Sequence, residues 1–146
     1  MNEERVHKVR GGEPWLARCK PTTVLEDATV PRSQIPAMMK AVNDIAAKYK
    51  VEVGTFGHAG DGNLHPTFLC DKRDAEEFKR VEEAIDEMFD TAIRLQGTLS
   101  GEHGIGTAKA KWMEKETSRG TILFSQRLRR ALDPKGLLNS TKLVGI

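Results

Sequence analysis

The ten residues Gly57–Pro66 constrain the fold more than any other part of the 146-residue chain. They hold the pair Asp61-Gly62 between two runs of strand-forming residues, 51–56 and 64–70. Asp-Gly favours a two-residue hairpin turn, because both central positions require a positive φ that these residues tolerate. The segment therefore predicts two antiparallel strands joined by a tight turn.

Two of the four histidines, His58 and His65, flank this turn. A two-residue turn would place them opposite each other, with Cβ atoms about 5 Å apart on one side of the sheet. Two imidazoles at that distance can bind one divalent ion, and the pattern favours this interpretation over two unrelated polar histidines. A wider loop that used all the glycines would remove this geometry.

The spacing of apolar residues predicts two amphipathic helices. Apolar side chains recur every three or four positions in residues 33–50 and again in residues 75–95. Asp74 followed by Glu77 is typical of a capping box at the start of the second helix. Gly97 is the expected C-terminal stop of the same helix.

Further strands are predicted at 22–29, which is rich in β-branched residues, and at 98–100. The order is then strand, helix, strand, strand, helix, strand and a helical tail. This order is typical of an α+β fold with a ferredoxin-like antiparallel sheet and helices on one face. The sequence thus divides into an irregular segment 1–21, a ferredoxin-like part 22–104 and a helical tail 105–146.

A second glycine-rich motif, Ser100–Gly106, contains Glu102 and His103. Glu102 can complete a His-His-carboxylate ligand set with open positions for substrate. His103 would then serve as a general base, a role common for imidazole. The alternative is an ordinary strand-to-helix loop. In a strict ferredoxin-like sheet Glu102 would lie far from the hairpin, so either the sheet is more complex or the hairpin is looser.

The charge is unevenly distributed. The net charge is +2, but residues 105–146 carry nine Lys or Arg against three acidic residues. A basic tail suits an anionic or protein partner, or is simply solvated. Because its only aromatic residues are Trp112 and Phe124, we expect no nucleic-acid partner.

No apolar run approaches the roughly 20 residues of a membrane span, so we expect no transmembrane segment. The start, Met1–Arg5, is charged where a signal peptide would be apolar. Cys19 and Cys70 are isolated and form no CxxC pair. These features predict a cytoplasmic protein with reduced cysteines.

Three separated motifs resemble the C-terminal region of FAD-linked 2-hydroxyacid oxidases and dehydrogenases. They are GHAGDGNLHP at 57–66, GTLSGEHGIG at 97–106 and LDPKGLLN at 132–139, and residues 24–33 add to the likeness. This family is of the vanillyl-alcohol oxidase type, and its glycolate oxidases are the nearest members. The resemblance implies FAD as cofactor and oxidation of a small 2-hydroxy acid, of the glycolate or D-lactate type, to the 2-oxo acid.

The resemblance also implies an FAD domain of roughly 200 residues or more, within the usual domain range. The sequence contains no such domain. The chain would therefore be the substrate or cap portion of a larger enzyme and inactive alone, with residues 105–146 packed on the FAD domain. Other oxidase subunits are further expected partners.

By position in the motifs, three residues would hold a divalent metal such as Zn, Mn or Fe: His58, His65 and Glu102. His103 would take the substrate proton as the catalytic base.

The resemblance assigns three more contacts. Arg10 and Asn63 would contact the substrate, and Asn139 would contact the flavin. A guanidinium fork suits a substrate carboxylate. At the flavin contact the family usually reads Asn-Pro-Gly-Lys, whereas this chain reads Asn139-Ser140-Thr141-Lys142, so the local turn departs from the family.

Two alternatives use the same residues without flavin chemistry. One is a stand-alone His/Glu metal-binding module, and the other is a ferredoxin-like interaction domain with the basic tail as its docking surface. A cap domain separated from its FAD domain would expose apolar surface and self-associate in its place, so we expect a homo-oligomer.

Overall fold

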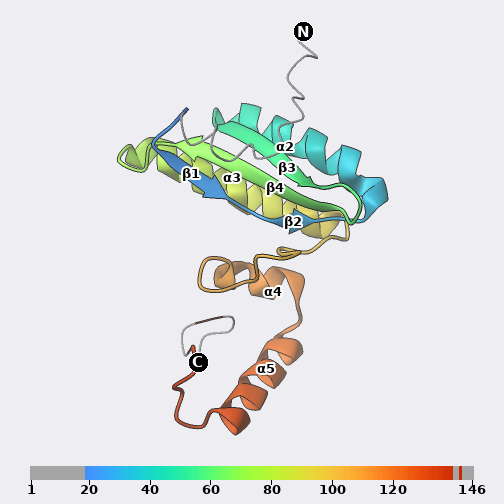
Figure 1. The fold of residues 1–146 in the computed structure, drawn as a ribbon, viewed down its shortest axis with the longest axis vertical. Coiled ribbons are helices and arrows are strands. Elements are labelled where there is room, and N and C mark those ends of the chain that lie inside the picture. The colour runs from blue at the N-terminus through green and yellow to red at the C-terminus, as the bar shows by residue number, and fades with distance from the viewer. Residues whose placement is uncertain (1–18, 140–141, 143–146) are drawn as a thin grey trace.

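The computed structural model describes residues 19–139 and residue 142. The predicted contact Arg10 and most of the segment 1–21 lie outside the described residues. Figure 1 shows the elements in chain order. They are β1 (Thr22–Leu25), β2 (Ala28–Thr29), η2 (Arg32–Gln34), α2 (Ile35–Tyr49), β3 (Glu52–His58), β4 (Asn63–Cys70), α3 (Ala75–Arg94), η3 (Ala110–Trp112), α4 (Met113–Glu116) and α5 (Arg119–Leu132).

The sheet confirms the predicted α+β fold with an antiparallel sheet. β4 is paired along one edge with β3 and along the other with β1 and β2, always antiparallel. Thr98 adds one antiparallel bridge to Thr29 at the outer side of β2. Counted as predicted strands, the order is fourth, first, third, second, as in a ferredoxin-like sheet. The predicted last strand, 98–100, is therefore reduced to a single bridge.

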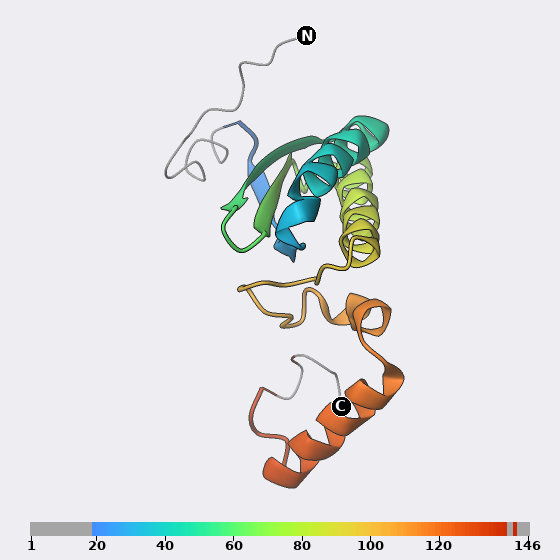
Figure 2. The same cartoon turned by 90° about the vertical axis from the view of Figure 1, so that its right-hand side faces the viewer.

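α2 and α3 cover one face of the sheet, as predicted, and do not cover the opposite face (Figure 2). Side chains alternate along a strand, so Leu64, Phe68 and Cys70 of β4 point toward these helices. They form a core with buried apolar residues of both helices, including Met38 and Met88. His65 has the opposite parity and faces away from α2 and α3.

The predicted strand 22–29 is interrupted at Glu26 and Asp27, and this divides it into β1 and β2. The Glu26 amide still donates to the Pro66 carbonyl at 3.0 Å, so the chain keeps its place beside β4. Both acidic residues are buried. The reason for the break is that Asp27 binds a distant loop, described below.

The ends of α3 differ in detail from the prediction. The Asp74 side chain caps the helix by accepting from the amides of Glu76 and Glu77, as expected. Glu77, however, accepts from the Asp71 amide at 2.8 Å and does not complete the capping box. At the other end Gln96, with φ 62°, and not Gly97 adopts the left-handed conformation.

The C-terminal tail forms one clear helix. The first part of the predicted helical tail forms a turn, the short η3 and one turn of α4, and α5 follows as the longest helix of the tail. No residue of α5 is buried, and it extends away from the sheet and its helices (Figures 1 and 2). Its region exposes large apolar side chains: Leu123, Phe124, Leu128, Leu132, Leu137 and Leu138. Within the described ranges, no helix has the length and apolar character needed to cross a membrane.

Candidate metal centre

The hairpin places His58 and His65 on one face by a route other than the predicted one. The turn is a four-residue loop, so His58 pairs with Asn63 and His65 pairs with Phe56. The predicted pairing of the two histidines is thus wrong by two residues. A shift of two keeps both side chains on the same face, whereas a shift of one would separate them. The ring centroids are 5.4 Å apart, nearly perpendicular.

Gly62 explains the wider loop. It alone of the pair Asp61-Gly62 has a positive φ, 83°, whereas the predicted tight turn needs two such residues. A Cβ at Gly62 would lie 2.0 Å from the Val30 carbonyl oxygen, so a side chain cannot be accommodated there. Val30 in turn donates its amide to the Gly62 carbonyl. The loop is therefore held against the segment that follows β2.

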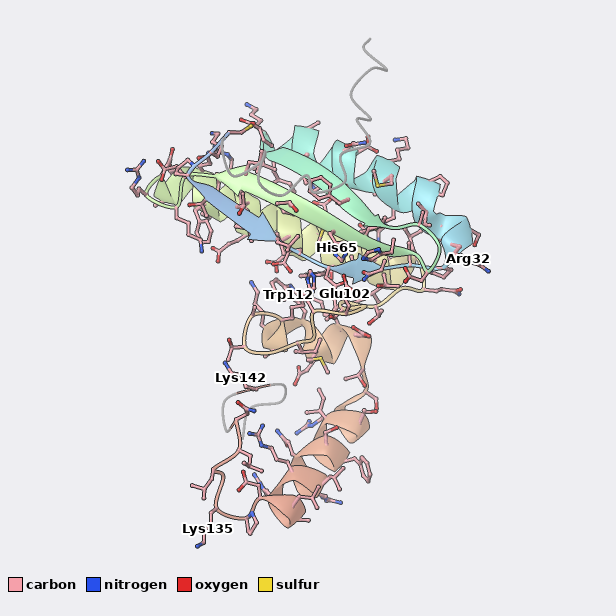
Figure 3. All side chains as sticks on the ribbon, in the orientation of Figure 1. Arg32, His65, Glu102, Trp112, Lys135 and Lys142 are labelled. Carbon is pink, nitrogen blue, oxygen red and sulfur yellow. The ribbon has the colours of Figure 1, made fainter. Side chains whose placement is uncertain are left out.

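Glu102 reaches the two histidines because the last strand is so short. Thr29 pairs with Asn63 at the hairpin end of the sheet, and Thr98 bridges Thr29 at the same end. The chain leaves the sheet there instead of running to the opposite end. As a result Glu102 Oε1 lies 2.8 Å from His65 Nε2 and 3.6 Å from His58 Nε2. Figure 3 shows His65 and Glu102 pointing toward each other.

The three side chains form a compact donor set. One ligand atom from each of His58, His65 and Glu102 lies within 4.8 Å of the other two. Two imidazole nitrogens and a carboxylate oxygen suit ions such as Zn²⁺, Fe²⁺ or Mn²⁺ and leave coordination positions open. His65 is the most buried member, with only 12% of its side chain exposed against 59% for His58.

His103 lies against this donor set. Its ring stacks on His65 with centroids 4.9 Å apart and an interplanar angle of 14°. Its Nε2 is 3.8 Å from Glu102 Oε1, and its Nδ1 is 3.9 Å from Asp27 Oδ2. The structure thus brings together four of the predicted site residues and sets a proton acceptor beside three potential ligands.

The sequence analysis missed Asp27 and its buried neighbours. Burial opposes ionisation of Asp27, but hydrogen bonds from the amides of Gly101 and His103, the Ser100 hydroxyl and the Glu102 amide outweigh it and hold the pKa at about 2. Two adjacent acidic residues inside a β-branched run were the signal that something other than a regular strand is formed there.

Lys109 is the buried cation beside these acids. Its Nζ lies 3.7 Å from Glu26 Oε2 and 3.9 Å from Asp27 Oδ2. Burial lowers the pKa of Lys109, with the two carboxylates acting in the opposite direction. Burial likewise raises the pKa of Glu26 against the attraction of Lys109. The group therefore combines two acids and one cation in a nearly solvent-free position.

A hollow of about 350 Å³ opens beside His103. The loop Gly104–Lys109, Leu25, Glu26 and Lys142 line the rest of it. Its size suits a small organic acid, and Lys142 adds a cation at its margin.

Two predicted contact residues have local structural roles. Asn63 is buried, and its Oδ1 accepts from the Thr29 hydroxyl at 2.9 Å. Asn139 is exposed and left-handed, with φ 49°, and its carbonyl accepts from Arg129 and from the Lys142 amide. A substrate or flavin contact for these two residues stays a prediction, as it does for Arg10.

The fold and site define an α+β domain that presents a His-His-Glu donor set and a neighbouring histidine on the side of its sheet opposite α2 and α3. Residues 2–143 match the model of a family described as FAD linked oxidases, C-terminal domain. The chain belongs to this family.

The names of individual relatives are consistent with this family. The chain is 55% identical over 128 residues to the glycolate oxidase subunit GlcD of Bacillus subtilis, covering 88% of this chain and 27% of the relative. It is 34% identical over 129 residues to GlcD of Escherichia coli K12, with 88% and 26% covered. It is 34% identical over 143 residues to a D-lactate dehydrogenase of Archaeoglobus fulgidus, with 98% and 31% covered. The chain thus spans between a quarter and a third of the length of these relatives.

Proposed function

We propose that this chain forms the substrate side of an FAD-dependent oxidoreductase that converts a small 2-hydroxy acid, of the glycolate or D-lactate type, to the 2-oxo acid. The observation that carries the proposal is the convergence of His58, His65 and Glu102 within 4.8 Å, with His103 stacked on His65. The named activities of the relatives support the substrate class.

In this proposal His58, His65 and Glu102 hold a divalent metal ion, which would polarise the substrate hydroxyl as a Lewis acid. Glu102 Oε1 lies 2.8 Å from His65 Nε2, so both atoms already face the same point. His65 is nearly buried and gives the ion a fixed ligand. His58 and Glu102 are more exposed and leave the site open to substrate.

His103 takes the proton of the substrate hydroxyl. Its Nε2 lies 3.8 Å from the ligand oxygen of Glu102, so a hydroxyl bound beside the donor set is within its reach. The hydride from the substrate carbon needs a separate acceptor. FAD, when bound in the whole enzyme, would supply this two-electron acceptor. The hollow beside His103 receives the rest of the acid, and Lys142 is a cation in its lining. Arg10 and Asn63 stay the predicted substrate contacts.

We also propose that residues 105–146 bind the FAD domain, with Asn139 toward the flavin. The support is the exposed apolar side of α5, where Phe124 is 65% and Leu132 is 76% exposed. An exposed patch of this kind marks an interaction surface. This observation favours a part of a larger enzyme over a stand-alone metal-binding module.

The first experiment measures metal binding. The chain is stripped with EDTA, offered Zn²⁺, Mn²⁺ or Fe²⁺, and analysed for bound metal after dialysis. We expect one ion per chain, lost in His65→Ala and in Glu102→Gln. The matched control is Glu83→Gln, which removes an exposed carboxylate of α3 and should leave binding unchanged. Equal binding by all variants would remove the metal from the proposal.

The second experiment tests the reaction. This chain replaces the corresponding C-terminal part of the Bacillus subtilis relative, and the chimaera is assayed with glycolate, D-lactate and a dye acceptor. We expect turnover with at least one acid, and a loss of about 10²- to 10⁴-fold in His103→Asn, the range for removal of a general base. The chain alone should give no turnover with added FAD, and robust turnover there would contradict its role as one part of an enzyme.

A cytoplasmic location and self-association stay predictions of the sequence. Sedimentation velocity of the chain alone and mixed with the flavin-binding part of the Bacillus relative would test the second. We expect self-association that the flavin-binding part displaces.

A further inference from the structure

Asp27 occupies an unusual position for a charged side chain. It lies in the break between β1 and β2, and none of its surface is exposed. A buried carboxylate is costly unless it is fully hydrogen-bonded. The hydrogen-bond donors of Asp27 therefore indicate which part of the fold this side chain supports.

Four consecutive residues donate to this one carboxylate. Oδ2 accepts from the Ser100 hydroxyl at 2.8 Å, from the Glu102 amide at 3.1 Å and from the His103 amide at 2.8 Å. Oδ1 accepts from the Gly101 amide at 2.9 Å. Successive amides that converge on an anion form a backbone nest, and here the anion is part of the same chain.

The loop that Asp27 binds has no other regular support. Residues 100–105 belong to no helix or strand. The Ser100 hydroxyl, which donates to Asp27, also accepts from the Gly104 amide at 2.7 Å, so the contact extends across the loop. The backbone conformation at Glu102 and His103 is therefore set largely by one distant side chain.

Lys109 holds both ends of this arrangement. Its Nζ donates to the carbonyls of Asp27 at 2.9 Å and Leu99 at 2.8 Å. The backbone that carries Asp27 and the backbone that leads into the loop are thus bound to the same ammonium group. Its charge also offsets the buried carboxylates of Glu26 and Asp27.

We propose that Asp27 is a positioning residue for the site: it acts through the backbone of residues 101–103 to direct Glu102 toward His65 and to hold His103 against the His65 ring. The proposal rests on the proposed function in so far as Glu102 is a metal ligand and His103 the base. A site held in this way is pre-organised before any ion or substrate binds, which spares the ordering cost on binding.

The test substitution is Asp27→Asn, which keeps the shape and replaces one acceptor oxygen by an NH₂ group. That group would face amides that also donate, so the loop loses acceptors without losing volume. The matched control is Thr91→Val. Thr91 is also buried, and its hydroxyl bonds within α3, to the Glu87 carbonyl and to Arg94. Both substitutions remove buried hydrogen bonds, but only the first touches the loop.

Two quantities are measured on the full chain: Zn²⁺ affinity by calorimetry, and hydrogen exchange of individual amides by NMR without metal. In Asp27→Asn we expect Zn²⁺ affinity to fall about 10- to 100-fold, as for other residues that support metal ligands. We expect the amides of residues 101–103 to exchange faster while those of α3 stay protected. Thr91→Val should change neither the affinity nor these three amides. Wild-type affinity in Asp27→Asn, with unchanged loop exchange, would overturn the proposal.

Failure of the metal hypothesis is distinguishable from failure of this one. If the wild-type chain binds no Zn²⁺, the exchange of residues 101–103 decides alone: faster exchange in Asp27→Asn and not in Thr91→Val supports positioning, and unchanged exchange contradicts it. If Asp27→Asn does not fold, Ser100→Ala replaces it. Loss of that single hydrogen bond should lower Zn²⁺ affinity roughly 3- to 10-fold and speed exchange at Gly104. No change in either would contradict the proposal.

Discussion

The body of the molecule, which is the sheet with α2 and α3, differs from the tail in the burial of its apolar side chains. In the body, Phe68, Met38 and Phe89 are fully buried between the sheet and two helices. In the tail, α5 has comparable apolar side chains, yet none of its residues is buried. The helix forms because Ser118 caps it by accepting from the Thr121 amide and because its apolar residues recur at helical spacing. Local signals can therefore complete a helix whose apolar face has no partner in the described part of the chain.

The packed core that stabilises the molecule therefore lies in the body. The body holds the donor set on an already packed sheet. The tail exposes an apolar surface, and we propose that a second protein part covers it. The following predictions compare matched residues from the two regions, or from the inside and outside of the body.

The largest contrast is between two phenylalanines. Phe68 is fully buried, whereas Phe124 is 65% exposed. Phe68→Ala should lower the free energy of unfolding by about 3–5 kcal/mol, because it leaves a cavity in the core. Phe124→Ala should change it by no more than about 0.5 kcal/mol. Urea unfolding followed by circular dichroism measures both. A large loss in Phe124→Ala would mean that α5 packs on the body in solution.

The next contrast is between two lysines of the same segment. Lys109 is buried against Glu26 and Asp27, whereas Lys111 pairs with Asp86 with more than half of its side chain exposed. Lys109→Met leaves two buried carboxylates without their cation and should cost about 3 kcal/mol or more. Lys111→Met should cost less than about 1 kcal/mol. Similar losses in the two variants, measured by the same unfolding assay, would refute the role assigned to Lys109.

Acid stability should depend on Asp27. Its pKa is about 2 in the fold against an ordinary value of 3.8, so the unfolded chain binds the proton more tightly. The resulting stability, roughly 2 kcal/mol, is fully present above pH 4 and is lost as the pH falls to about 2. Wild type and Asp27→Asn are unfolded in urea across pH 2–6 without metal. The stability difference between them should shrink toward pH 2, and a difference independent of pH would contradict the prediction.

Loss of the whole tail should also have only a small effect on stability. Deletion of residues 118–146 should change the unfolding free energy of the body by no more than about 1 kcal/mol, because α5 buries nothing there. It should abolish self-association, as should serine at Leu123, Phe124 and Leu128. Sedimentation velocity measures this second effect. A deletion variant that still associates would move the interaction surface elsewhere.

The sequence was most informative where a pattern repeats. α3 was predicted closely because its apolar residues recur over five turns and Asp74 caps it. The shared face of His58 and His65 was also predictable, since side-chain parity survives a shift of two residues. The register itself was not, because it depends on Gly62 lying against Val30, a contact between segments that no local pattern records.

The cluster of His and Glu side chains was predictable from the sequence, and the residues that support it were not. His58, His65, Glu102 and His103 lie in glycine-rich motifs and were found from residue type and from the family resemblance. Asp27 lies more than seventy residues before the loop it binds. Its only local sign is a charged residue in a β-branched run. Likewise, Gln96 and not Gly97 adopts the left-handed conformation after α3, whereas Gly97 approaches the Thr29 carbonyl so closely that a Cβ would lie 2.2 Å away.

Glu116 has a consequence for how this protein tolerates insertions. It ends α4, and its carboxylate accepts from the Leu99 amide at 2.9 Å and from the Thr98 hydroxyl. Thr117 alone separates it from Ser118, the cap of α5. The connection between body and tail is therefore very short, and the direction of α5 depends on the sheet edge that leads into Glu102. Variation in length is far easier in the exposed turn 72–73 between β4 and α3 than at this connection.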